Sequence, residues 1–84
     1  MNIDIKVLGP GCPNCRKLYA EAKSAVDILA APATVTKVED MKDIMSYKVM
    51  STPALVINGE VKAAGRIPAA AEICTWLATA AMKE

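Results

Sequence analysis

Two cysteines separated by two residues are the groups in this chain best suited to chemistry. The segment Gly-Cys-Pro-Asn-Cys at residues 11–15 directly follows a strand-like run, Ile3 to Leu8, and stands at the start of a long helical pattern. The first N–H groups of a helix lack partners within the helix and carry a partial positive charge, which favours a thiolate over a thiol. This placement predicts a reactive thiol pair suited to thiol–disulfide exchange.

The two thiols are not equivalent in this pattern. Cys12 precedes the helix and projects from its tip, close to Arg16 and Lys17, so the pKa of its thiol should be lowered. Pro13 suits the first helical position, where a missing N–H leaves no hydrogen bond unmade. We predict that Cys12 is the nucleophile, attacking a substrate disulfide, and that Cys15 is the resolving thiol, expelling the reduced product. The helical period places Cys15 on one apolar stripe with Leu18, Tyr19, Ala22, Val26 and Leu29.

The bulk composition excludes several classes of protein. The 84 residues suffice for one small domain, predicted to span residues 1–84, and the net charge of +1 is spread along the chain. This distribution argues against nucleic acid and a membrane surface as partners. Asp4 and Lys6 interrupt the N-terminal apolar run, which is therefore unlike a signal peptide. We therefore expect a cytoplasmic monomer without a cofactor. In the cytoplasm, an isolated Cys-x-x-Cys is more often catalytic or metal-binding than structural.

Hydrophobic periodicity and turn residues predict the order β-α-β-α-β-β-α. The short middle helix should begin after Asp40 as N-cap and bury Met41, Ile44 and Met45. In the last helix, Cys74 suits a half-buried position and Trp76 a core position. The predicted strands cover Ile3–Leu8, Thr34–Val38, Ala54–Ile57 and Glu60–Ala64, the last two joined by an Asn58-Gly59 hairpin turn. The predicted helices cover about Pro13–Ala30, Met41–Tyr47 and Pro68–Met82.

A second motif, Thr52-Pro53 immediately before a strand and hairpin, gives the chain a family resemblance. With the cysteine motif, it resembles minimal thioredoxin-fold proteins, and is most similar to the small prokaryotic glutaredoxin-like proteins often called redox-active disulfide proteins. The similarity is carried by residues 7–15 and 50–66. It implies an α/β fold with a mixed four-stranded sheet flanked by three helices. It also implies that Pro53 is cis, beside the cysteine pair, and that the backbone of Thr52 pairs with an extended substrate segment.

The resemblance also implies an activity. It implies a thiol–disulfide oxidoreductase that reduces a disulfide-containing protein substrate, with Pro13, Asn14, Thr52 and Pro53 as substrate-binding residues. Glutaredoxins hold glutathione with a Gly-Gly and acidic element, where this chain has Ala-Gly-Arg-Ile-Pro at residues 64–68. We therefore expect an electron donor such as a thioredoxin reductase, with glutathione as the alternative.

Two departures from thioredoxins concern the cysteine motif itself. Thioredoxins place a Trp directly before the first cysteine, where this chain has Gly11. They also place a buried acid six residues before that cysteine, where this chain has Lys6. The sequence therefore does not identify a proton acceptor for Cys15.

A metal or metalloid carrier that uses the same cysteine pair is the alternative function. Structural zinc requires four ligands, and the chain has no histidine and only one further cysteine, Cys74. Copper chaperones carry a Met two residues ahead of the first cysteine, where this chain has Pro10, and their fold ends in a strand. The predicted terminal helix discriminates against them. An iron–sulfur cluster bridged between two monomers, as in some glutaredoxin-like proteins, stays open as an alternative.

Overall fold

The computed structural model describes residues 2–11 and 13–82, so Cys12 lies outside the described residues. The described chain has the predicted order β-α-β-α-β-β-α, and its last element is a helix, unlike the strand that ends a copper chaperone. The elements are β1 (Ile3–Leu8), α1 (Pro13–Leu29), β2 (Ala33–Val38), α2 (Met41–Ser46), β3 (Ala54–Ile57), β4 (Glu60–Ala64) and α3 (Ala70–Met82).

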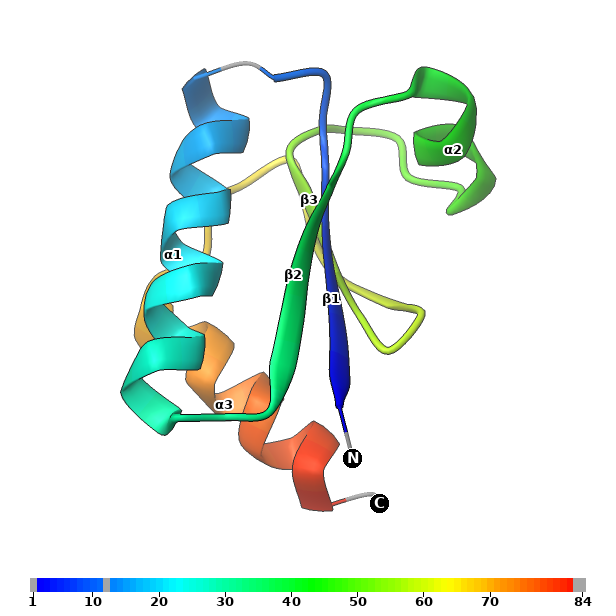
Figure 1. Cartoon of the computed structure of the whole chain (residues 1–84). Helices are drawn as coiled ribbons and strands as arrows, with labels where there is room; N and C mark the ends of the chain where they lie inside the picture. Colours follow the sequence, from blue (N-terminus) through cyan, green and yellow to red (C-terminus); the bar gives the residue numbers. More distant parts are fainter. Residues whose placement is uncertain (1, 12, 83–84) are drawn as a thin grey trace.

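Within the described residues, the strands form one mixed four-stranded sheet in the order β2-β1-β3-β4. β1 and β2 are parallel, whereas β1–β3 and β3–β4 are antiparallel. A parallel pair needs a crossover connection, and α1 supplies it. Helices α1 and α3 cover one face of the sheet, and α2 lies on the other side (Figure 1). The predicted fold class is confirmed. Across residues 2–11 and 13–82, the structure has no helix with the length and apolar character needed to cross a membrane.

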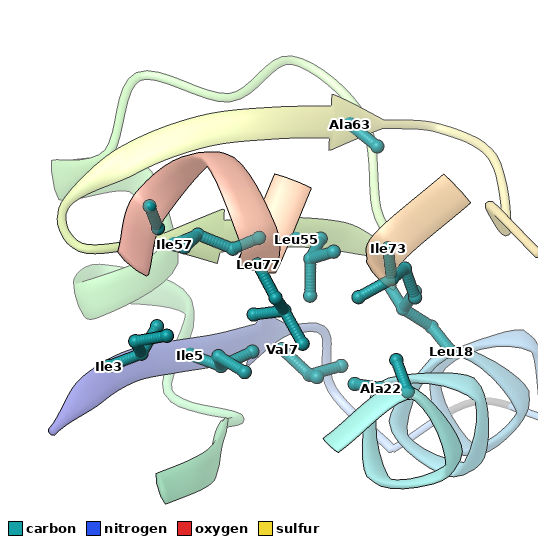
Figure 2. Packing of buried hydrophobic residues seen from close by; sticks show 12 residues of the cluster. Ile3, Ile5, Val7, Leu18, Ala22, Leu55, Ile57, Ala63, Ile73 and Leu77 are labelled. Atoms are coloured by element: carbon teal, nitrogen blue, oxygen red, sulfur yellow. The ribbon is translucent and has the colours of Figure 1, made fainter. Parts of the chain in front are cut away.

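The main core lies between the sheet and the pair α1 and α3. Strand β1 alternates, so Ile3, Ile5 and Val7 point toward the two helices, where Leu18 and Leu77 meet them (Figure 2). The opposite face carries a smaller cluster under α2. Its buried members are Leu8, Ile44, Ala54 and Val56.

Helix α1 ends at Leu29 because the next residue leaves the helical conformation. Ala30 has a φ of 49°, and the N–H of Ala31 donates to the carbonyl of Val26 at 3.1 Å, a left-handed helix stop. The predicted apolar stripe is not buried to its end, because Leu29 is 42% exposed in the last turn, where the chain reverses toward β2 (Figure 1). Ala25 is fully buried instead.

Helix α3 begins at Ala70, two residues later than predicted. Pro68 is buried rather than placed in a first helical turn, and the carbonyl of Ala69 accepts the first helical bond from Ile73 at 3.1 Å. The N–H of Ala70 donates to the Glu21 carboxylate at 2.8 Å. A side chain of α1 therefore caps α3 and fixes where that helix starts.

Helix α2 confirms its predicted cap but not its predicted core. The Asp40 side chain accepts a hydrogen bond from the N–H of Lys42 at 2.8 Å, as an N-cap does. Within α2, all of whose residues are described, Ile44 alone is buried. Met41 and Met45 are 54% and 67% exposed, so their assignment to the core is wrong. A helix of six residues makes fewer than two turns, and here it presents one side chain to the sheet.

The hairpin turn between β3 and β4 is confirmed. Asn58 and Gly59 both have positive φ values, 50° and 81°, as the favoured two-residue hairpin turn requires. The Asn58 side chain also accepts a hydrogen bond from the N–H of Asp4 at 2.9 Å, which ties the turn to the start of β1.

Candidate functional site

Several chain segments meet where β1 and β2 end. Leu8 is paired with Val38 of β2 and with Ala54 of β3, so β1 and β2 end where β3 begins. The N–H of Gly9 donates to the carbonyl of Val38 at 2.9 Å, which continues the pairing one residue further. Helix α1 starts at this same edge of the sheet (Figure 1). The topology thus brings the start of α1 to the end of the sheet at which β1 and β2 stop and β3 begins.

The sulfur of Cys15 is held at this edge. Cys15 lies in the first turn of α1, and its side chain is 5% exposed. A Cβ placed on Gly9 would fall well inside contact distance of Cys15 Sγ and 3.1 Å from Cys15 Cβ. The sulfur therefore occupies the space that any other residue at position 9 would fill. The sequence did not indicate this contact of Gly9, since nothing in the spacing shows which side chain approaches it.

Cys15 lines a cavity of about 190 Å³. Gly11 has a φ of 90°, and a Cβ there would lie 3.0 Å from Glu39 Oε2, so the carboxylate of Glu39 lies against the segment that enters α1. The residues that line the cavity thus include one with a thiol, two with cationic side chains and one with a carboxylate. Its lining residues are Val7, Gly9, Gly11, Cys15, Arg16, Lys37 and Glu39.

The alternation of side chains along the strands decides which charged groups reach this cavity. Lys37 is in register with Val7 and faces α1, where its Nζ lies 4.6 Å from the centre of the Tyr19 ring. Lys6 is one residue earlier than Val7 and points to the other face of the sheet. There its Nζ donates to the Tyr47 hydroxyl at 3.1 Å, a hydrogen bond that raises the pKa of Lys6.

Pro13, Asn14, Thr52 and Pro53 are not among the described residues that line the cavity. Pro13 and Asn14 are exposed in the first turn of α1, and Thr52 is exposed before β3. The Thr52–Pro53 peptide bond is cis, as the resemblance implied. Pro53 is buried, and its carbonyl accepts a hydrogen bond from the N–H of Gly65 at 2.9 Å. Cys12, the predicted nucleophile, lies outside the described residues and directly precedes Pro13 in the sequence.

Comparison with known proteins agrees with this fold. The sequence model of the thioredoxin domain matches residues 3–78. The chain belongs to the thioredoxin-domain family. A thioredoxin from Methanothermobacter thermautotrophicus is 35% identical over 69 residues, which cover 82% of this chain and 90% of the relative. A thioredoxin from Methanocaldococcus jannaschii is also 35% identical over 69 residues, covering 82% of this chain and 79% of the relative.

The other cysteine of this thioredoxin domain lies away from the cavity. Cys74 is half-buried in α3, as predicted, and its Sγ lies 3.7 Å from the carbonyl oxygen of Ala25, to which the thiol donates. Among residues 2–11 and 13–82, the structure brings together no group of three or more His, Cys, Asp or Glu side chains that could hold a metal ion.

Arg66 of this thioredoxin domain is held by a neighbour on the surface. Its guanidinium donates two hydrogen bonds to the Glu72 carboxylate, at 3.1 and 2.8 Å. This contact raises the pKa of Arg66 and lowers the pKa of Glu72. Both groups are solvent-accessible, so the pair serves mainly to orient the two side chains.

Proposed function

We propose that this thioredoxin domain is a thiol–disulfide oxidoreductase that reduces disulfide-containing proteins. The observation that carries the proposal is that Cys15 is buried in the first turn of α1, with its sulfur against Gly9, and lines a cavity together with the cationic side chains of Arg16 and Lys37. Burial shields a resolving thiol from outside reagents, and the cations favour its thiolate. The thioredoxin relatives support the same class of activity.

In the proposed reaction, Cys12 is the nucleophile and Cys15 the resolving thiol. The Cys12 thiolate attacks one sulfur of the substrate disulfide, and the other substrate sulfur leaves as a thiolate that takes up a proton. Cys15 then attacks Cys12, which releases the second substrate thiol and leaves a Cys12–Cys15 disulfide. Two electrons pass from the cysteine pair to the substrate.

Substrate docking is assigned to the segments that flank the cysteines. Thr52 is exposed immediately before β3, where its backbone can pair with an extended substrate segment. Pro13 and Asn14 are exposed in the first turn of α1 and are proposed to complete the contact surface.

The oxidised protein must be reduced again before the next turnover. We assign this step to a reductase of the thioredoxin reductase type in the cytoplasm, with glutathione as the competing donor. The comparison is direct: NADPH consumption is followed with the oxidised protein and either a thioredoxin reductase or glutathione with glutathione reductase. Faster consumption with glutathione would reverse the assignment of the donor.

The first test is a redox titration of the metal-stripped protein against defined thiol–disulfide buffers, with free thiols counted at each point. The proposal expects a reversible two-electron transition in which Cys12 and Cys15 become bonded. The variant Cys74→Ser is the matched control, because it removes the third thiol and should leave the transition unchanged. Failure to form the Cys12–Cys15 bond reversibly would overturn the proposal and turn attention to metal binding.

A second test separates the roles of the two cysteines. Cys15→Ser should accumulate mixed disulfides through Cys12, visible as an added substrate mass, whereas Cys12→Ser should abolish turnover. Full activity of Cys12→Ser would contradict the assignment of the nucleophile.

A further inference from the structure

We propose that Glu39 accepts the proton of the Cys15 thiol and so activates Cys15 to expel the reduced product. The inference rests on the proposed function, because this proton transfer matters only if Cys15 resolves a mixed disulfide. It names a residue that the spacing of the cysteine motif does not indicate, since Glu39 lies 24 positions after Cys15 in the chain.

The need for a proton acceptor follows from the burial of Cys15. The thiolate, not the thiol, is the nucleophile in disulfide exchange. Cys15 is only 5% exposed, so bulk water has little access to its sulfur. A buried thiol also ionises less readily than an exposed one. A base beside the sulfur would remove both obstacles.

The strand geometry supplies Glu39 to the correct face of the sheet. Residues two apart on a strand share a face, so Glu39, just beyond the end of β2, follows Lys37 on the side that faces α1. Lys6 points to the opposite face, toward Tyr47. Glu39 therefore contributes a carboxylate to the cysteine side of the sheet, which Lys6 does not.

The local contacts place Glu39 at the same cavity as Cys15. Glu39 and Cys15 both line the cavity, and Glu39 Oε2 approaches the space beside Gly11 to within 3.0 Å of a Cβ built there. A volume of about 190 Å³ has room for several water molecules, each of which occupies about 30 Å³ in the liquid. The proton can pass directly or through one such water.

The other charged groups that line the cavity are Arg16 from α1 and Lys37 from β2. Both are cations near neutral pH, so they favour the Cys15 thiolate once the proton has left, but neither can accept that proton. Among the described residues that line the cavity, Glu39 is the one acid. Because Glu39 is exposed, it can return the proton to solvent.

The proton leaves Cys15 Sγ for a carboxylate oxygen of Glu39, and the Cys15 thiolate attacks the sulfur of Cys12. The Cys12–Cys15 bond forms while the bond between Cys12 and the substrate breaks. The substrate sulfur departs with the electron pair of that bond and takes up a proton from Glu39, directly or through solvent, so Glu39 returns to its carboxylate form.

The test follows the two exchange steps separately in Glu39→Gln. Reduced protein in a Cys74→Ser background is mixed with a fluorescent disulfide peptide, and acid-quenched samples are weighed by mass spectrometry to follow the mixed disulfide. The expected result is an attack step that is not slowed and a resolution step slowed about 100-fold near pH 7, since general bases typically contribute 10²–10⁴-fold. The difference in resolution rate between Glu39→Gln and the wild type should become smaller above about pH 9, where solvent ionises the Cys15 thiol without a base.

Asp27→Asn is the matched control, because it removes one negative charge from an exposed position near the far end of α1. It should resolve the mixed disulfide at the wild-type rate. Wild-type resolution by Glu39→Gln would overturn the inference, as would equal slowing of both steps or equal slowing in Asp27→Asn. These outcomes leave the proposed function intact, whereas a wild-type protein that reduces no disulfide contradicts the proposed function itself.

Discussion

The two faces of the sheet differ in how much core they carry. On one face, α1 and α3 bury side chains from β1, β3 and β4 in a single large cluster, to which α1 contributes Leu18, Ala22 and Ala25 (Figure 2). On the other face, α2 covers a cluster of four buried residues, and Ile44 is its own contribution. The face that carries most of the core also carries Cys15.

This difference explains why the sulfur is held in one place. Cys15 belongs to the same helix stripe as Leu18 and Ala22, both fully buried, so the packing that stabilises the fold also orients the start of α1. The α2 face stays thin, and its methionines are open to solvent. Mutations on the two faces should therefore separate stability and redox chemistry.

The largest effect is expected in the main core. Leu77→Ala should lower the free energy of unfolding by about 3 kcal/mol, because it leaves a cavity where a fully packed side chain stood. Ile44→Ala, on the α2 face, should lose about 2 kcal/mol, because the small cluster there can collapse more readily. Urea unfolding of the reduced proteins, followed by circular dichroism, measures both. A larger loss of unfolding free energy for Ile44→Ala than for Leu77→Ala would contradict the view that the face covered by α1 and α3 contributes more to stability.

A smaller loss of stability, but a specific loss of redox function, is expected at Gly9. Gly9→Ala forces Cys15 Sγ out of its position, so it should cost about 1–3 kcal/mol of stability and slow the release of substrate from the mixed disulfide. Gly59→Ala is the matched control, because no described atom beyond its chain neighbours lies within 4 Å of the new Cβ. It should lose about 1 kcal/mol through its positive φ and keep normal exchange kinetics.

If both alanine variants resolve mixed disulfides at the same rate, the close contact between Gly9 and the sulfur has no catalytic consequence. Quenched-flow mass spectrometry of the mixed disulfide provides this rate, and urea unfolding provides the stability in the same buffer.

A loss of about 1 kcal/mol is expected where α1 caps α3. Glu21→Ala removes the acceptor of the Ala70 N–H and leaves that donor unpaired at a helix start. Glu21→Gln keeps an amide oxygen in place and should lose less. Lys23→Ala, at an exposed position of the same helix, controls for helix propensity. Equal stabilities of Glu21→Ala and Lys23→Ala in urea unfolding would mean that the hydrogen bond from Ala70 to Glu21 does not stabilise the start of α3.

The smallest effect is expected on the exposed surface of α2. Met41→Gln and Met45→Gln should each change the free energy of unfolding by no more than about 0.5 kcal/mol, because both side chains are already more than half exposed. Thermal unfolding compared with the wild type measures this. A loss close to that of Ile44→Ala would mean that these methionines contribute to the smaller core after all.

Local sequence signals predicted local structure well. Asp40 caps α2 and Asn58-Gly59 makes the hairpin turn, because each acts through atoms only a few residues away. The order of elements followed from hydrophobic periods and turn residues. The cis bond before Pro53 came from the family resemblance rather than from the residues themselves.

The errors and omissions share a different cause. Met41 and Met45 have the right spacing for a buried stripe, but hydrophobicity alone does not indicate how much surface a short helix will meet. The cap on α3 joins residues 49 positions apart, Glu21 and Ala70. No local rule predicts such a pairing, since it depends on how α1 packs beside α3.

The sequence by itself determined the order of the elements, the position of Cys15 in the first turn of a helix and the hairpin turn between the last two strands. These features depend on backbone preferences and periodicities that operate over a few residues. Only the tertiary structure decided that Gly9 makes room for the Cys15 sulfur and that Glu39, rather than Lys6, shares its cavity. Those relations depend on strand register and on the side to which each strand residue points, which are established only when the sheet and helices pack together.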